Sequence, residues 1–291
     1  MCRWTVSFER RFVLLLLMLC SAAAEAGLYP RVELERVREV YGVNIEAVLF
    51  DDIRAYLTPE ELKSLNKVSL TFPLPDNKDS VDVFGFAIDL NSGQMAFPAQ
   101  AIKFFDDLAL SFAWYEHTGQ DPTSIAEYVV NLHRKGLPFL PPLAALNVPE
   151  KAWEQSQYVD DVSQKILKSG LAFLLLHELA HWHFKHGAYH DISYAAARKQ
   201  EQQADDFALE VMARMKTPPY GMVVWFLATS LVTSDRVTTH PLSRDRLNAI
   251  AHSLSESPGR YISYENRHSL TKQDILRLAQ DIQDIAARLK Q

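Results

Sequence analysis

Apolar residues recur at helical spacing through most of the chain. The pattern predicts helices over residues 101–115, 124–133, 160–186, 196–215, 220–233, 243–255 and 271–290. Residues 31–66 also read as helical. Within them Thr58-Pro59-Glu60-Glu61 predicts a helix start, with Thr58 as the N-cap and Pro59 at the first helical position.

Strand patterns are confined to the N-terminal part of the chain. Residues 67–72 alternate like a strand, and residues 81–90 and 94–97 read as two strands joined at Asn91-Ser92-Gly93, a hairpin signal. The predicted fold class is therefore α+β, mainly helical, with a small N-terminal sheet or hairpin. The hairpin can offer an edge strand to an extended peptide, although an ordinary packed hairpin fits the pattern at least as well.

Proline spacing suggests where the chain divides. The segment 136–149 holds four prolines and is the best linker candidate, between an N-terminal α+β region, 27–150, and a helical region, 151–291. The same segment fits a loop packed on a single domain that spans 27–291. The apolar run 222–232 is too short to cross a bilayer, so we expect a buried core helix and no integral membrane span in the mature chain.

The N-terminus has the form of a signal peptide. A basic region with Arg3, Arg10 and Arg11 precedes the apolar run 12–20, and Ala24-Glu25-Ala26 fits the cleavage rule of small residues. We therefore expect cleavage near Ala26 and an exported product, periplasmic or secreted. An uncleaved anchor or a buried first helix is the alternative.

Composition narrows the classes of function. The 291 residues are 48% hydrophobic, enough for a folded core, and the net charge is −6. No block of lysine and arginine stands out, so the sequence gives no support for nucleic-acid binding. Both cysteines, Cys2 and Cys20, lie in the predicted signal peptide. The mature chain would then have no disulfide and no thiolate metal site.

The motif His177-Glu178-Leu179-Ala180-His181 lies within the helix predicted over 160–186. Its spacing places two imidazoles on one helix face, one turn apart, where they can bind one Zn²⁺. Glu178 stands beside them and can reach a water at the metal without binding the metal itself. The preceding apolar run predicts a buried helix, in which two histidines and a glutamate are costly without a partner such as a metal. The motif therefore predicts one Zn²⁺ per chain.

A third ligand is expected because zinc in hydrolases usually has three protein ligands and one open position. Glu201 lies on the next predicted helix, twenty residues after His181, and the loop between lets the two helices pack antiparallel. Asp205 shares the face of Glu201 and can accept the free N–H of a ligating histidine. Considered alone, Glu201 and Asp205 would be interpreted as acidic residues on a solvent-exposed helix face. Next to the histidine pair, we favour the ligand role for Glu201.

The sequence HELAH followed by EQQAD resembles the gluzincin metallopeptidases that carry an ExxAD motif on the second helix. The best-known members are relatives of the heat-shock membrane protease and the CAAX prenyl protease. The resemblance covers roughly residues 160–250 and implies a zincin-like metallopeptidase core. It implies His177, His181 and Glu201 as zinc ligands, Glu178 as the catalytic base and Asp205 as a carboxylate behind the ligands.

A second motif, at residues 239–247, is similar to the H-P-x-x-x-x-R element of that group. His240 and Arg246 match its two polar positions. His240 is the first candidate for a donor to the oxyanion and Arg246 the second; alternatively, His240 is a reversible fourth ligand that keeps the enzyme latent. The phage-exclusion Lit-like peptidases share comparable motifs, but the predicted signal peptide argues against that intracellular comparison.

Other residues near the motif are expected to be structural. His183 stands where zincins usually carry an apolar residue, and His186 occupies the place of a recurrent histidine of the group. Both are expected at the surface or at the edge of the core. Tyr189 and His190 lie between the two metal helices, where they read as loop residues rather than residues of the cleft.

The function that these patterns favour is that of a zinc-dependent endopeptidase acting on a protein or peptide substrate, with Glu178 as general base. A zinc amidase that acts on cell-wall peptides is one alternative. A binding module in which zinc is only a brace is another. The intact Glu178 argues against that module, because a purely structural site needs no base.

Overall fold

The computed structural model describes residues 27–76, 83–135, 139–230, 243–262 and 270–289. The predicted signal peptide, both cysteines and the candidate residue His240 lie outside these residues, so export stays a prediction. Among the described residues, no helix is both long and apolar enough to cross a membrane.

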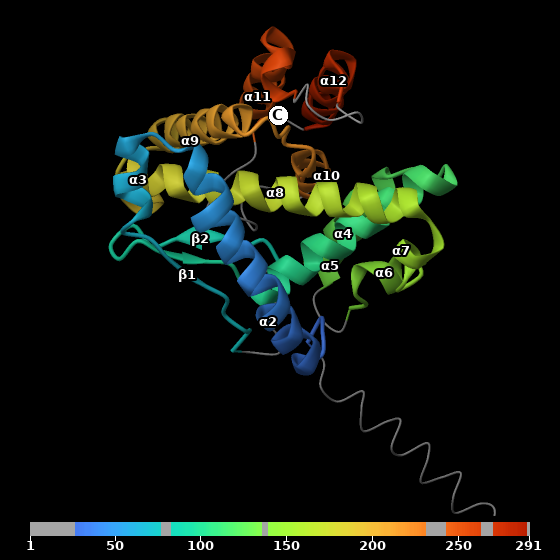
Figure 1. The fold of residues 1–291 in the computed structure, drawn as a ribbon. Coiled ribbons are helices and arrows are strands. Elements are labelled where there is room, and N and C mark those ends of the chain that lie inside the picture. The colour runs from blue at the N-terminus through green and yellow to red at the C-terminus, as the bar shows by residue number, and fades with distance from the viewer. Residues whose placement is uncertain (1–26, 77–82, 136–138, 231–242, 263–269, 290–291) are drawn as a thin grey trace, which may run out of the picture.

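Helices dominate the described structure, and a small sheet lies near the N-terminus (Figure 1). The N-terminal helices and turns are α2 (Arg31–Ala47), η2 (Val48–Asp52), η3 (Ile53–Tyr56), α3 (Pro59–Leu65), α4 (Ala99–Thr118), α5 (Thr123–Lys135), α6 (Pro142–Ala145) and α7 (Ala152–Gln155). They are followed by α8 (Gln157–His183), η4 (Tyr189–Asp191), α9 (Tyr194–Arg214), α10 (Gly221–Thr229), α11 (Arg244–Glu256), η5 (Pro258–Tyr261) and α12 (Lys272–Arg288). The predicted α+β, mainly helical fold class is confirmed.

The start of α3 has the predicted chemistry. The Thr58 side chain accepts the backbone N–H of Glu61, the Glu61 carboxylate accepts the backbone N–H of Thr58, and Pro59 occupies the first helical position. This capping box satisfies N–H groups that a helix start leaves without partners. Glu61 also accepts two N–H groups of Arg214, each at 2.9 Å, so the same carboxylate joins α3 to α9.

The sheet has the strand order β1-β3-β2, with β1 (Ser69–Thr71), β2 (Ala87–Ile88) and β3 (Gln94–Ala96). The central strand β3 is parallel to β1, with Leu70 opposite Met95, and antiparallel to β2, with Ile88 opposite Met95. This confirms the predicted hairpin. It leaves β2 at one edge of the sheet.

The strand expected over 81–90 is much shorter than predicted. Residues 81–82 lie outside the described structure, and Phe84 and Phe86 leave the strand path because the N–H of Phe86 donates to the carbonyl of Phe84 at 2.8 Å. Both rings are buried and contact Trp225 of α10, with centroid distances of 5.0 and 5.5 Å. Burial of these rings outweighs strand alternation here.

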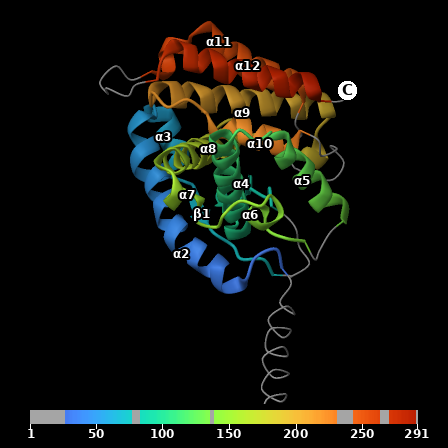
Figure 2. The same ribbon diagram turned by 90° about the vertical axis from the view of Figure 1, so that its right-hand side faces the viewer.

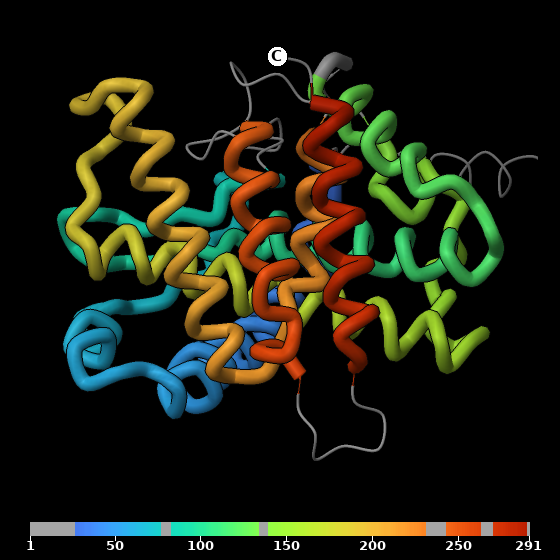
Figure 3. The backbone as a smooth tube through the Cα atoms, turned by 90° about the horizontal axis from the view of Figure 1, so that it is seen from above, coloured from blue at the N-terminus to red at the C-terminus, as the bar shows by residue number. Residues whose placement is uncertain are grey.

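Helix α8 runs through the middle of the molecule, with α4, α9 and α10 packed around it (Figures 1 and 2). Every residue from Ser169 to His181 is buried, as the apolar run in the sequence predicts. α11 and α12 lie side by side over α9 and α10 (Figure 3). The described part of the proline-rich segment, residues 139–149, packs on α4 through α6, and the Tyr115 hydroxyl donates to the carbonyl of Leu146 at 3.0 Å.

The contact between α8 and α10 requires two glycines. A Cβ atom on Gly221 would lie 2.2 Å from the carbonyl oxygen of Ile166 and 2.5 Å from the Cα of Gly170. The Ser169 hydroxyl accepts the N–H of Gly221 at 2.9 Å, which fixes the start of α10 at this contact. The backbones of α8 and α10 therefore approach more closely than any side chain would allow.

We predict that Gly221→Ala destabilises the fold by about 3 kcal/mol, because the new methyl group meets backbone that cannot move aside. Thermal unfolding followed by circular dichroism measures the change. Gly119→Ala is the control: its φ of 70° strains an alanine, but nothing lies within 4 Å of the new Cβ, so it should cost only about 1–2 kcal/mol. A Gly221→Ala protein as stable as the control would contradict the close packing of these helices.

Candidate metal centre

The two histidines of the HExxH motif lie one turn apart in the buried half of α8. His177 is 2% exposed and His181 is 3% exposed. Their Nε2 atoms are 3.1 Å apart, so the two imidazoles converge on one point. This follows from the helix, since side chains four residues apart share a face.

Helix α9 runs back along α8 and brings Glu201 to the same point (Figure 1). Glu201 Oε2 lies 3.5 Å from His177 Nε2, and Glu201 Oε1 lies 3.4 Å from His181 Nε2. Glu201 is 1% exposed. The structure thus brings together the three residues that the sequence assigns as ligands, as a buried group that could hold a metal ion.

The size of this group fits a small tetrahedral ion. Ligand bonds of about 2.0–2.1 Å, arranged tetrahedrally, separate the ligand atoms by about 3.3–3.4 Å. The two imidazole nitrogens are 3.1 Å apart, and each lies 3.4–3.5 Å from one oxygen of the Glu201 carboxylate, Oε1 for His181 and Oε2 for His177, so the spacing is close to that value. Two imidazole nitrogens with one carboxylate oxygen are also a donor set that catalytic metal sites use.

Asp205, one helical turn after Glu201, holds the first histidine in place. Its Oδ1 lies 3.0 Å from His177 Nδ1, and Asp205 is completely buried. Because a carboxylate only accepts hydrogen bonds, His177 carries a proton on Nδ1. Its Nε2 is the atom that faces Glu201 and His181, as a metal ligand requires.

Arg246, near the start of α11, joins the two acids of α9. Its Nε and Nη2 donate to Asp205 at 2.5 and 2.8 Å, and its Nη1 lies 2.8 Å from Glu201 Oε2. The sequence suggested Arg246 as a donor to an oxyanion. The structure instead directs its guanidinium at these two carboxylates, so we assign it a positioning role. The first candidate for that donor, His240, lies outside the described residues.

Burial and ion pairs shift the pKa values of His177 and Asp205 in opposite directions. Burial lowers the pKa of His177, but hydrogen bonds to Asp205 and Glu201 outweigh it and raise the pKa to about 9. Burial raises the pKa of Asp205, but the charge of Arg246 and the bond to His177 outweigh it, so the net pKa is lowered. The interactions among His177, the two acids and Arg246 therefore outweigh burial and favour the charged forms of His177 and Asp205.

His186 orients the second histidine, a role that the sequence analysis missed. Its Nδ1 lies 2.8 Å from His181 Nδ1, and its Nε2 lies 3.2 Å from Gln203 Oε1. Burial lowers the pKa of His186, which favours the neutral ring that can accept the His181 proton. After α8 ends, the chain turns back toward His181 at Lys185, which adopts a φ of 56°. Lysine rarely adopts this conformation, so no residue type in the sequence indicated the turn.

Tyr189 also contacts the centre, although the sequence reads as a loop there. The hydroxyl of this half-buried tyrosine donates to Glu201 Oε1. Burial and the nearby charges of Glu201 and Glu178 raise the pKa of Tyr189 far above its usual range, so the phenol keeps its proton. Glu201 is thus held on one oxygen by Tyr189 and on the other by Arg246.

Glu178 of α8 is 1% exposed, and its side chain lies where α8 packs against the sheet. The backbone N–H of Ile88, in β2, donates to Glu178 Oε2 at 2.9 Å. The N–H of the next residue, Asp89, donates to β3 instead, so the N–H of Ile88 points outward from the edge of the sheet. Glu178 therefore lies against the outer edge of β2, a contact between distant segments that no local pattern predicts.

Residues 138–264 match the family Peptidase U49. The match indicates a peptidase family. It includes the ligand group, Glu178, Asp205 and Arg246, together with α8, α9 and α11. No curated protein and no solved structure matches the chain. The likeness to the heat-shock membrane protease and CAAX prenyl protease group stays an interpretation of the motifs.

We predict that Asp205→Asn lowers the affinity for zinc about 10–100-fold, because His177 loses the carboxylate that orients it. Competition with a zinc-binding dye measures the affinity. Asp206→Asn removes the same charge from the neighbouring residue, whose side chain accepts from Gln202 at 2.9 Å on the exposed side of α9. This control should bind zinc normally. Equal affinities in the two variants would contradict the role of Asp205.

Proposed function

We propose that this protein is a zinc-dependent endopeptidase. The observation that carries the proposal is the convergence of His177, His181 and Glu201 beside Glu178, within the residues that match a peptidase family. Glu178 argues for catalysis, since a purely structural metal site has no use for a buried base next to its ligands.

Zinc bound by these three residues would supply Lewis acidity, which polarises a scissile carbonyl and makes water a stronger acid. The protein contributes a base whose position is fixed. Glu178 takes the proton of the attacking water on a carboxylate oxygen and later passes it to the leaving amine. The N–H of Ile88 stabilises the negative charge of Glu178 at Oε2, which keeps the carboxylate ionised and fixes its position.

The edge of the sheet supports an extended peptide as substrate. β2 is an outer strand, and the N–H of Ile88 marks the side of this strand on which Glu178 lies. A polypeptide that lies along this edge would pass directly by the base, although the N–H of Ile88 is held by Glu178 and would not pair with it. The hairpin would then position the substrate in addition to forming part of the sheet.

The two alternatives differ in ways that can be measured. Cleavage of unfolded casein favours the endopeptidase, and digestion of purified peptidoglycan favours the cell-wall amidase. The match to a peptidase family supports an enzyme over a zinc-braced binding module.

We predict that Glu178→Gln lowers the rate of casein cleavage at least 10²-fold, the usual contribution of a general base, while the protein keeps its zinc. An amide is nearly the same size as a carboxylate and can still accept the N–H of Ile88, so the fold should survive. Zinc content and casein cleavage are measured on the same sample. Normal cleavage by this variant would overturn the mechanism.

Two alanine variants in the same helix provide the controls. His181→Ala should lose zinc and activity together, because a ligand is removed. His183→Ala, two residues further on, should lose neither, since His183 Nδ1 contacts Ser64 Oγ at 2.9 Å instead of the metal group. If His181→Ala retains both zinc and activity, the ligand assignment is wrong.

A further inference from the structure

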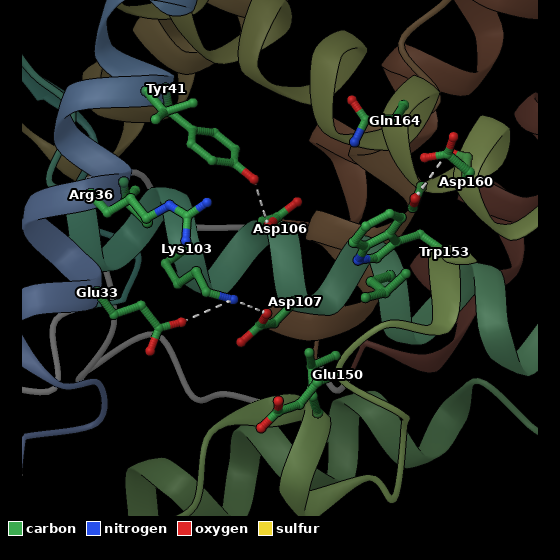
Figure 4. A pocket seen from close by; sticks show the side chains of 15 residues that line it. Glu33, Arg36, Tyr41, Lys103, Asp106, Asp107, Glu150, Trp153, Asp160 and Gln164 are labelled. Carbon is green, nitrogen blue, oxygen red and sulfur yellow. Dashed lines mark hydrogen bonds and ion pairs between the residues drawn. The ribbon is translucent and has the colours of Figure 1, made fainter. Parts of the chain in front are cut away.

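A cavity of about 530 Å³ lies between α2, α4 and the N-terminal part of α8 (Figure 4). The charged side chains between α2 and α4 already have partners within the chain. Lys103 Nζ lies 3.5 Å from Glu33 and pairs with Asp107. The hydroxyl of Tyr41 donates to Asp106 at 2.9 Å. These contacts join the two helices, so we assign them to packing and look for further chemistry at the metal group.

Hydrolysis of a peptide bond needs a hydrogen-bond donor at the carbonyl oxygen, where negative charge develops in the transition state. The sequence suggested Arg246 for this role. In the structure, its Nε, Nη1 and Nη2 atoms all face Asp205 or Glu201, and the residue is only 8% exposed. Arg246 is thus committed to the two acids. Tyr189 places a different donor at the ligand group.

The hydroxyl of Tyr189 lies next to both the third ligand and the base. It donates to Glu201 Oε1, the oxygen that lies 3.4 Å from His181 Nε2. The centroids of the Tyr189 and His181 rings are 6.4 Å apart. Glu178 is near enough for its charge to raise the pKa of the phenol. A carbonyl group that enters between the ligand group and Glu178 would therefore come close to this hydroxyl.

A substrate can enter the centre only if a covering group moves. The two histidines of the ligand group, Glu178 and Glu201 are each between 1% and 3% exposed. Tyr189 is suited to move, because it begins the single turn η4, in which no residue is buried. The side chain of the next residue, His190, is 81% exposed. Arg246 holds the other oxygen of Glu201, so the ligand stays in place when the tyrosine leaves it.

We propose that Tyr189 is a catalytic residue whose hydroxyl moves from Glu201 to the carbonyl oxygen of the scissile bond and donates a hydrogen bond to the charge that develops there. This role rests on the proposed peptidase activity. A tyrosine hydroxyl carries one proton that it can donate, and rotation about its side-chain bonds is enough to change the acceptor. The bond to an oxyanion is stronger than the bond to a neutral carbonyl, so it favours the transition state over the bound substrate.

Tyr189→Phe tests this role, because it removes the hydroxyl and keeps the ring. At saturating zinc we expect kcat for a fluorescent casein to fall about 10²–10³-fold, the usual cost of losing one donor to an oxyanion. KM should not change, because the bond forms in the transition state. The affinity for zinc, measured by competition with a zinc-binding dye, should also stay the same, since Arg246 still holds Glu201.

Tyr194→Phe is the matched control. It removes the same hydroxyl five residues further on, where the ring is 63% exposed and contacts the guanidinium of Arg198 at 5.1 Å. This variant should keep kcat and zinc affinity. A Tyr189→Phe protein with weaker zinc binding but normal kcat at saturating zinc would overturn the catalytic role and leave Tyr189 to position Glu201. Normal values of both would also overturn it. Wild-type protein that binds zinc but cleaves no casein would refute the proposed endopeptidase, and this role with it.

Discussion

The contact between Arg246 and the two acids of α9 is the interaction on which the centre of this protein depends. Glu201 and Asp205 are both buried, and buried carboxylates are unfavourable unless a cation and hydrogen bonds offset their charge. Arg246 supplies that cation from α11 and binds both acids at once. The same pairing joins α9 to α11, so the packing of the C-terminal helices and the geometry of the ligand group share one cause.

Each of the two histidines is oriented by a neighbouring side chain at its Nδ1 atom. Asp205, fixed by Arg246, orients His177 through Nδ1, and the ring of His186 does the same for His181. Both Nε2 atoms consequently point at Glu201. A site that is positioned before a metal arrives loses little conformational entropy on binding it, which favours both affinity and a defined geometry.

Much of the fold and the core of the site could be predicted because they follow local rules. The spacing of His177 and His181 places them on one helix face, and Thr58 with Glu61 predicts the start of α3. The partners of these residues could not be predicted. Ile88 reaches Glu178 only after the sheet has packed on α8, and the short β2 results from tertiary burial of Phe84 and its neighbours.

The central claim is that two imidazoles and one carboxylate bind a single zinc ion. Zinc K-edge X-ray absorption of the zinc-loaded protein, with elemental analysis of the same sample, tests it most directly. We predict about one zinc per chain, coordinated only by nitrogen and oxygen at about 2.0–2.1 Å, with the outer-shell scattering of two imidazoles. Protein that takes up no zinc, or a spectrum without two imidazoles, would contradict the account.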